Sequence, residues 1–227
     1  MKILAMLFPK FTAIDFIGPA NTWMFIPNVQ IQLAAAQPGP VVTDIGLTIN
    51  ATHNFNTCFQ EPDVLLVPGG GIGAFNALQD DSFIDQVARI GAKANWVTSV
   101  CNGSLLLGAA GLLRGYKAGC YWYSREYLRQ FGAEPLNERI VIDRNRATGG
   151  GMTAGIDFAL TMVGLWGGET AGQLTELSLE YAPKPPFRTG LPELAPPNVL
   201  AIANDRLATE MPNAMVDATA KRRGFVT

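Results

Sequence analysis

Short apolar runs alternate along the first half of the chain with longer stretches in which apolar residues recur every three or four positions. The apolar runs predict buried β-strands at residues 2–8, 29–36, 64–67 and 96–100. The stretches between them predict helices at residues 14–26 and 82–93, the second capped by Ser82. Residues 41–59 are β-prone and predict a hairpin. Residues 102–113 are small and apolar on every side, which is typical of a buried helix.

The second half of the chain continues the alternation and ends in a proline-rich stretch. Short strands are predicted at residues 117–120 and 139–143. Helices are predicted at residues 123–131, 154–166, 169–181 and 199–210. Residues 182–198 contain six prolines and predict an arm on the surface.

Regular alternation of strands and helices predicts a doubly wound α/β sandwich with a mainly parallel sheet. We expect one domain over residues 1–227, with the proline-rich arm at about 182–198 followed by a C-terminal helix. In such a sandwich, ligands bind outside the carboxyl ends of the strands. The residues that directly follow the predicted strands are therefore the first candidates for a functional site.

Composition narrows the classes of function. The 227 residues are 48% hydrophobic and 16% charged, which supplies a large core. The net charge of −2 leaves no basic footprint for nucleic acid or an anionic membrane. The longest apolar stretch, residues 104–113, is about half of the ~20 residues that a membrane span needs. Three unevenly spaced cysteines and no A-x-A-like cleavage site near the start favour a reducing, cytoplasmic setting.

Cys101 has the most informative surroundings of the three cysteines. The β-prone run WVTSV ends directly before it, and Asn102-Gly103 opens the buried helix. Cys101 therefore falls on a strand-to-helix turn, the geometry of a nucleophile elbow. The positive end of the following helix would favour the thiolate. The alternative is that Cys101 is simply a small buried apolar residue.

A run of three glycines, residues 69–71, follows the buried strand at 64–67. Consecutive glycines let backbone N–H groups point at a developing negative charge. We therefore expect the amides of Gly70, Gly71 and Asn102 to act as an oxyanion-type nest beside Cys101. The run also matches a dinucleotide-binding fingerprint, but it lacks the acidic residue expected about 20 positions later. A plain tight turn is the other alternative.

Asp15 follows the first strand in an otherwise apolar stretch, where a carboxylate is costly without a partner. It is either the N-cap of the next helix or a carboxyl that meets the Cys101 thiol, because the two strand ends are neighbours in a doubly wound sheet.

His53 is the one histidine, so a zinc site built from several histidines is excluded; we expect a surface or edge residue. Cys58 and Cys120 are expected to be structural.

Three segments together resemble the DJ-1/PfpI superfamily, and within it the bacterial isocyanide hydratases: DFIGP at residues 15–19, VPGGG at 67–71 and SVCNG at 99–103. The resemblance covers residues 2–190. It implies a flavodoxin-like sandwich, a homodimer and Cys101 as nucleophile. Hydratases, like this chain, have Asp where most of the superfamily has Glu, here Asp15. The chain departs from the hydratases at Asn102, where they usually have Thr, and has Tyr121 where relatives often have His.

The same resemblance implies a cofactor-independent lyase that adds water to an isocyanide and releases an N-formamide. Asp15 would be the general acid and base, with Gly18, Thr148 and Gly150 in the substrate pocket and no bound metal. The expected partner is a small-molecule isocyanide, with neither nucleic acid nor membrane. Two alternatives use the same thiol: a redox sensor or stress-response protein with an oxidisable cysteine, and a glyoxalase- or amidase-like hydrolase.

Overall fold

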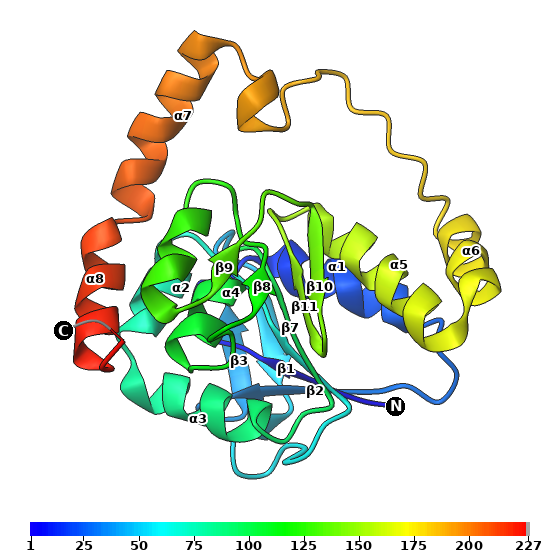
Figure 1. Cartoon of the computed structure of the whole chain (residues 1–227). Coiled ribbons are helices and arrows are strands. Elements are labelled where there is room, and N and C mark those ends of the chain that lie inside the picture. Colours follow the sequence, from blue (N-terminus) through cyan, green and yellow to red (C-terminus); the bar gives the residue numbers. More distant parts are fainter. Residues whose placement is uncertain (226–227) are drawn as a thin grey trace.

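A seven-stranded β-sheet lies at the centre of the computed structural model, which describes residues 1–225 (Figure 1). Its strand order is β10-β11-β7-β6-β1-β2-β5, and every neighbouring pair is parallel except β10 with β11. The strands are β1 (Lys2–Met6), β2 (Gln30–Ala35), β5 (His53–Asn54), β6 (Val64–Val67), β7 (Trp96–Val100), β10 (Ile140–Asp143) and β11 (Arg146–Gly149). The mainly parallel α/β sandwich predicted from the alternation is confirmed. Val226 and Thr227, the end of the predicted domain, lie outside the described residues.

Helices cover both faces of the sheet (Figure 1). One face carries helices that pack on one another in series: α1 (Ala13–Trp23), α5 (Ala154–Gly167) and α6 (Glu169–Ser178). The other face carries α2 (Ile72–Leu78), α3 (Asp81–Gly91), α4 (Gly103–Ala109), the 3₁₀-helix η1 (Arg125–Phe131) and α8 (Asn213–Arg222). Two small sheets complete the body: β3 (Gly39–Val42) with β4 (Thr48–Ala51), and β8 (Lys117–Ala118) with β9 (Glu134–Pro135).

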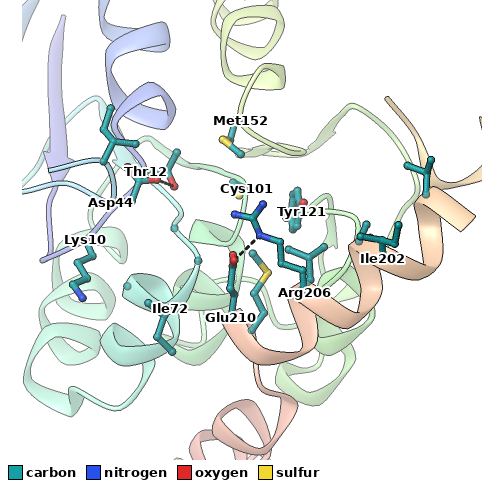
Figure 2. Close-up of a pocket in the computed structure, with 18 residues that line it drawn as sticks. Lys10, Thr12, Asp44, Ile72, Cys101, Tyr121, Met152, Ile202, Arg206 and Glu210 are labelled. Atoms are coloured by element: carbon teal, nitrogen blue, oxygen red, sulfur yellow. Dashed lines mark hydrogen bonds and ion pairs between the residues drawn. The ribbon is translucent and has the colours of Figure 1, made fainter. Parts of the chain in front are cut away.

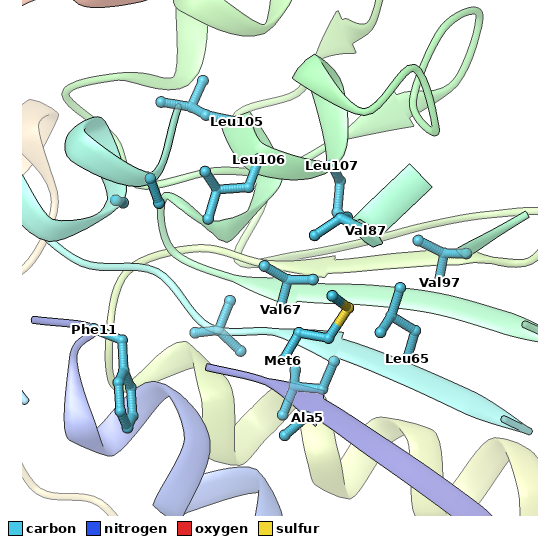
Figure 3. Packing of buried hydrophobic residues seen from close by; sticks show 14 of the residues in the cluster. Ala5, Met6, Phe11, Leu65, Val67, Val87, Val97, Leu105, Leu106 and Leu107 are labelled. Carbon is cyan, nitrogen blue, oxygen red and sulfur yellow. The ribbon is translucent and has the colours of Figure 1, made fainter. Parts of the chain in front are cut away.

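On the side of the sheet that α4 covers, aliphatic side chains of the central strands form much of the core. Figure 3 shows Met6, Leu65 and Val97 facing the leucines of α4. Leu105, Leu106 and Leu107 are fully buried, which explains why the segment is apolar on every side. Each such side chain contributes about 1.5–3 kcal/mol relative to an exposed one. The packing fixes α4, and with it the turn that precedes this helix.

A long surface arm separates α6 from the last two helices. Residues 179–196 are mostly exposed and contain one turn of 3₁₀-helix, η2 (Pro192–Leu194). In Figure 1 this arm arches away from the body, and α7 (Pro197–Glu210) leads back to it. Helix α8 is anchored by Arg222 and Arg223, whose guanidinium groups pair with Asp81 at 2.9 and 3.0 Å. Among residues 1–225, no helix has the length and apolarity to cross a membrane.

Four local predictions need correction. Asp80, rather than Ser82, caps α3: its carboxylate accepts a hydrogen bond from the Phe83 N–H at 3.1 Å, and Ser82 already lies in the first turn. The hairpin spans residues 39–51, while His53 and Asn54 join the main sheet. Helix α2 and strand β11 were not predicted. The chain also continues beyond the predicted C-terminal helix into α8.

Candidate active site

Cys101 lies at the carboxyl end of the central strand β7, on a tight turn into α4. Its φ of 58° is in the left-handed region, which is strained for a residue with a side chain. Its N–H donates to the carbonyl oxygens of Gly150 at 2.7 Å and Gly149 at 3.1 Å, which holds the turn. Gly103 permits the close approach, because a Cβ there would lie 2.1 Å from the Val67 carbonyl oxygen. The predicted strand-to-helix turn at Cys101 is confirmed.

Asp15 lies inside α1 rather than at its N-cap, and its side chain is fully buried. Its Oδ2 accepts a hydrogen bond from the Gly69 N–H at 3.0 Å. Oδ1 is buried and has no conventional hydrogen-bond partner among residues 1–225. The N-cap interpretation of Asp15 is therefore wrong, and its carboxyl needs another explanation.

Gly69 is the point at which the predicted groups converge. A methyl group on this residue would lie 2.5 Å from the Asn102 nitrogen, 2.7 Å from Cys101 Cβ and 2.9 Å from Asp15 Oδ2. A glycine is therefore required here on steric grounds. The structure thus brings Asp15 and Cys101 together, although they are 86 positions apart in the sequence.

Gly70 and Gly71 line the same cavity as the Cys101 sulfur. Within residues 1–225 their N–H groups donate to no acceptor, so both are available to a ligand. The Asn102 N–H lies close enough to Cys101 to favour its thiolate. Amide N–H groups with no acceptor among residues 1–225 therefore belong to residues that line the same cavity as Cys101.

The Asn102 side chain has a structural role that sequence reasoning missed. Its Nδ2 donates to the Gly70 carbonyl oxygen at 2.8 Å. Its Oδ1 accepts from the Ser124 hydroxyl and, at 3.7 Å, from the Cys120 thiol. Asn102 is fully buried, so these bonds are shielded from water. Asn102 therefore holds the glycine run against the Cys101 turn.

Of the other candidate residues, Cys120 lies close to Cys101. It is buried, its thiol contacts Asn102, and its charge raises the pKa of the Cys101 thiol. Cys58 is buried away from the cavity, near Phe55 and Gln60. His53 is half-buried on β5, the edge strand, where its Nδ1 is 2.8 Å from the Thr52 hydroxyl. The prediction that His53 is an edge residue is confirmed.

The Asp15 carboxyl and the Cys101 thiol both have raised pKa values. Burial raises the pKa of Asp15 to about 8, and Asp44 adds to this, against the lowering effect of the Gly69 N–H and a smaller one from Cys101. Burial raises the pKa of the Cys101 thiol well above its usual range, and the charge of Asp15 raises it further. The expected resting thiolate is therefore wrong, because burial outweighs the helix dipole. At neutral pH the pair is mainly a carboxylic acid and a thiol.

A cavity of about 780 Å³ opens above the Cys101 sulfur (Figure 2). Its walls come from the loop after β1, the small hairpin, the glycine run, the Cys101 turn and α7. The lining residues outside α7 are Lys10, Thr12, Asp44, Ile45, Gly70, Gly71, Ile72, Gly73, Cys101, Tyr121 and Met152. Those of α7 and its end are Val199, Ile202, Ala203, Arg206, Leu207, Glu210 and Met211.

Gly18, Thr148 and Gly150 do not line this cavity, contrary to the prediction. Gly18 faces α5, where an added Cβ would lie 3.2 Å from Ile156. The Thr148 hydroxyl accepts from the Gly119 N–H at 2.7 Å, and the Gly150 carbonyl is used by the Cys101 turn. These three residues support the surrounding elements instead.

Tyr121 and one side of α7 line the cavity, which the sequence did not predict. Burial raises the pKa of the Tyr121 phenol, and the charge of Cys101 raises it further, so this group keeps its proton at neutral pH and can donate. The lining positions of α7 (199, 202, 203, 206, 207 and 210) follow helical spacing. That spacing was visible in the sequence, but the surface that it faces was not.

Comparisons with known proteins show the family and the fold to which the chain is similar. Residues 1–165 match the model of the DJ-1/PfpI family. The chain is 42% identical over 212 residues to the isonitrile hydratase of Pseudomonas putida, covering 93% of this chain and 92% of that protein. A crystal structure of a ThiJ/PfpI family protein from Pseudomonas syringae matches with a TM-score of 0.92 at 40% identity, covering 96% of this chain and 90% of that one. A deglycase from Thermococcus kodakarensis is 25% identical over 146 residues, 64% of this chain and 87% of that protein.

Proposed function

The chain belongs to the DJ-1/PfpI family, and from this premise we propose that it hydrates isocyanides to N-formamides, with Cys101 as nucleophile and Asp15 as general acid and base. Isonitrile is another word for isocyanide, so the relative from Pseudomonas putida supports this reaction class. The observation that carries the proposal is the buried carboxyl of Asp15 beside the Cys101 turn, with its pKa raised to about 8. The reaction needs a proton donor next to a nucleophile, and the Asp15 carboxyl lies directly beside the Cys101 turn that borders the cavity.

The first step forms a covalent bond to sulfur. Asp15 gives its proton to the terminal carbon of R–N≡C while the Cys101 sulfur bonds to that same carbon. The thiol proton passes to the carboxylate left on Asp15, so the acid is restored. The product is a thioimidate, R–N=CH–S–Cys101, and no net charge has been created. A neutral acid and thiol are therefore sufficient starting states.

The second step uses water. Asp15 protonates the C=N nitrogen of the thioimidate and accepts a proton from a water molecule that adds to the carbon. The tetrahedral adduct, R–NH–CH(OH)–S–Cys101, collapses by breaking the C–S bond, and its hydroxyl proton returns to the sulfur through Asp15. N-formamide and the free thiol result. The free amides of Gly70 and Gly71 would stabilise charge that develops on the oxygen, each worth on the order of 10²–10³ in rate.

The site argues against the redox alternative. The thiolate is the form that oxidants attack, and burial raises the pKa of the Cys101 thiol well above its usual range. A hydrolase acting on other carbonyl compounds would use the same groups, and a panel that includes methylglyoxal and simple amides separates it from the hydratase.

The decisive experiment follows formamide production from a model isocyanide by absorbance. Cys101→Ala should abolish turnover, whereas Cys58→Ala, which also removes a buried thiol but lies away from the cavity, should retain it. Rapid quenching followed by intact-protein mass spectrometry should show wild type heavier by the mass of one isocyanide. Turnover by Cys101→Ala at the wild-type rate would disprove the covalent route.

We also propose that the chain forms a homodimer, as the resemblance to its family implies. Several large apolar side chains are exposed on α6 and the arm, among them Leu177 at 78% and Phe187 at 75%. Sedimentation velocity at micromolar concentration should give twice the chain mass of 24.4 kDa. A single species of chain mass would disprove it.

A further inference from the structure

Helix α7 presents an apolar stripe that no other element of residues 1–225 covers. Val199, Ile202 and Ala203 stand on one side of the helix, at i, i+3 and i+4. Val199 is 45% and Ile202 68% exposed, whereas Leu207, one turn further on, is buried against the body. Figure 2 shows Ile202 and Arg206 on the side of α7 that faces the Cys101 turn. The stripe therefore forms a free wall of the cavity.

The base of this wall is tied to the nucleophile turn. Met211, which ends α7, is buried, and its sulfur lies 3.5 Å from Asn102 Nδ2. Asn102 in turn follows Cys101 and holds Gly70. The position of the wall relative to the Cys101 sulfur is thus set by packing at the end of the helix, while the first half of the helix projects over the opening.

The charges around the cavity cancel. Arg206 and Glu210 pair on α7 at 2.8 Å. Across the opening, Lys10 and Asp44 also line the cavity and contribute one charge of each sign. A lining with no net charge has no excess charge to attract an ionic substrate, whereas an uncharged substrate needs no counter-charge there.

The cavity is also much larger than a simple isocyanide requires. Its volume of about 780 Å³ lies within the range of pockets that bind drug-sized ligands. An alkyl isocyanide of a few carbons would leave most of this space, and all of the α7 stripe, uncovered. A body of two fused rings attached to the isocyanide would fill more of this volume and cover more of its apolar lining.

We propose that α7 is the specificity wall of this enzyme and selects uncharged isocyanides carried on a bulky, apolar, ring-containing group. This inference rests on the proposed function and adds the substrate class to it. The wall lies outside residues 1–165, which match the family model, so the shared fold supplies the chemistry and the C-terminal helix supplies the selection. The reactive carbon binds at Cys101, and the ring system binds against Val199 and Ile202.

The test compares two uncharged probes, methyl isocyanide and 2-naphthyl isocyanide. Wild type should show a kcat/KM at least about 10-fold higher for the naphthyl probe, because each methylene-sized contact in an apolar pocket is worth roughly 10-fold or more. Ile202→Ala should lower kcat/KM for the naphthyl probe about 10-fold, mainly through KM, and leave the methyl probe within about twofold. Leu200→Ala is the matched control, since Leu200 is on α7 but does not line the cavity.

Binding of the product separates failure of this inference from failure of the proposed function. N-(2-naphthyl)formamide should bind wild type and lose about 10-fold in affinity in Ile202→Ala, measured by calorimetry. If wild type hydrates neither probe but Ile202→Ala still binds the formamide about 10-fold more weakly, the hydratase proposal fails and the role of α7 in binding the ring is supported. If the naphthyl-to-methyl ratio is equal in wild type and Ile202→Ala, the wall is disproved and the hydratase stands. Dissociation of a dimer by Ile202→Ala, with an unchanged ratio, would likewise overturn it by showing that a second copy covers the stripe.

Discussion

Replacing Asp15 by Asn tests the buried acid directly. Asp15 is fully buried, and its Oδ2 accepts from the Gly69 N–H at 3.0 Å. An asparagine has nearly the shape of a protonated carboxyl: its amide oxygen keeps the bond from Gly69, and its NH₂ group takes the place of the carboxyl O–H. The variant therefore fixes the side chain in the neutral form that the wild type reaches only by binding a proton.

The size of the effect follows from the pKa of Asp15, which is raised by burial from 3.8 to about 8. Between these two values the folded protein binds a proton at Asp15 that the unfolded chain has released. The free energy of unfolding of wild type therefore falls as the pH rises, by about 1.4 kcal/mol for each pH unit. This contribution is fully present below pH 3.8 and is lost through pH 8. Relative to wild type, Asp15→Asn should thus gain roughly 4 kcal/mol of stability between pH 4 and pH 7.

The assay is urea denaturation followed by tryptophan fluorescence at several values between pH 4 and pH 7.5. Asp143→Asn is the control, because Arg144 lowers the pKa of that half-buried carboxyl. The stabilisation by Asp143 is present above pH 3.8, so its loss should be constant across this window. If the difference between wild type and Asp15→Asn is also constant, Asp15 is ionised in the folded protein. It could not then be the proton donor, and the proposed first step would fail.

Three further predictions concern activity and packing. The kcat/KM of wild type should fall as the pH rises through about 8, where Asp15 loses its proton; a profile flat to pH 9.5 would contradict the acid role. Asn102→Thr should lower the free energy of unfolding in urea by about 1–3 kcal/mol, because the hydrogen bond to the Gly70 carbonyl is lost. An unchanged free energy of unfolding would show that this hydrogen bond does not stabilise the fold. Gly69→Ala should lose about 1–3 kcal/mol of its free energy of unfolding and most of its turnover, because the added methyl group would clash with the Cys101 turn. The control, Gly190→Ala, has open space around the added methyl group and should match wild type in both measurements.

The central strands could be predicted because burial on both faces leaves a continuous apolar run in the sequence. The predicted bounds of β6 and β7 match the structure to the residue. Strand β11 has no such run: its sequence, Arg-Ala-Thr-Gly, becomes a strand because it pairs with β7 on one side and β10 on the other. Helix α2 is equally hidden, since it begins directly after the glycine run, where the sequence indicates a turn.

The residues of the candidate site could be predicted from the sequence, whereas their protonation could not. The rule that ligands bind at the carboxyl ends of the strands predicts that Asp15 and Cys101 lie close together, as the structure shows. Their protonation depends on how completely the fold buries the two side chains, and a local sequence pattern does not give the extent of that burial. The role of the Asn102 side chain was hidden for a similar reason, because Gly70 and Ser124 reach it from segments distant in sequence.

Burial of the acid and burial of the thiol serve one purpose in the proposed reaction. The terminal carbon of an isocyanide must gain a proton as well as a nucleophile, so an acid is needed as early as a thiolate. A carboxyl with a pKa of about 8 still holds its proton at pH 7, yet it is a stronger acid than the Cys101 thiol, whose pKa lies well above 9. Asp15 therefore gives up its proton first, and the carboxylate formed beside Cys101 is the base that takes the thiol proton. The thiolate thus arises only when a substrate has accepted the proton, which protects the sulfur between turnovers.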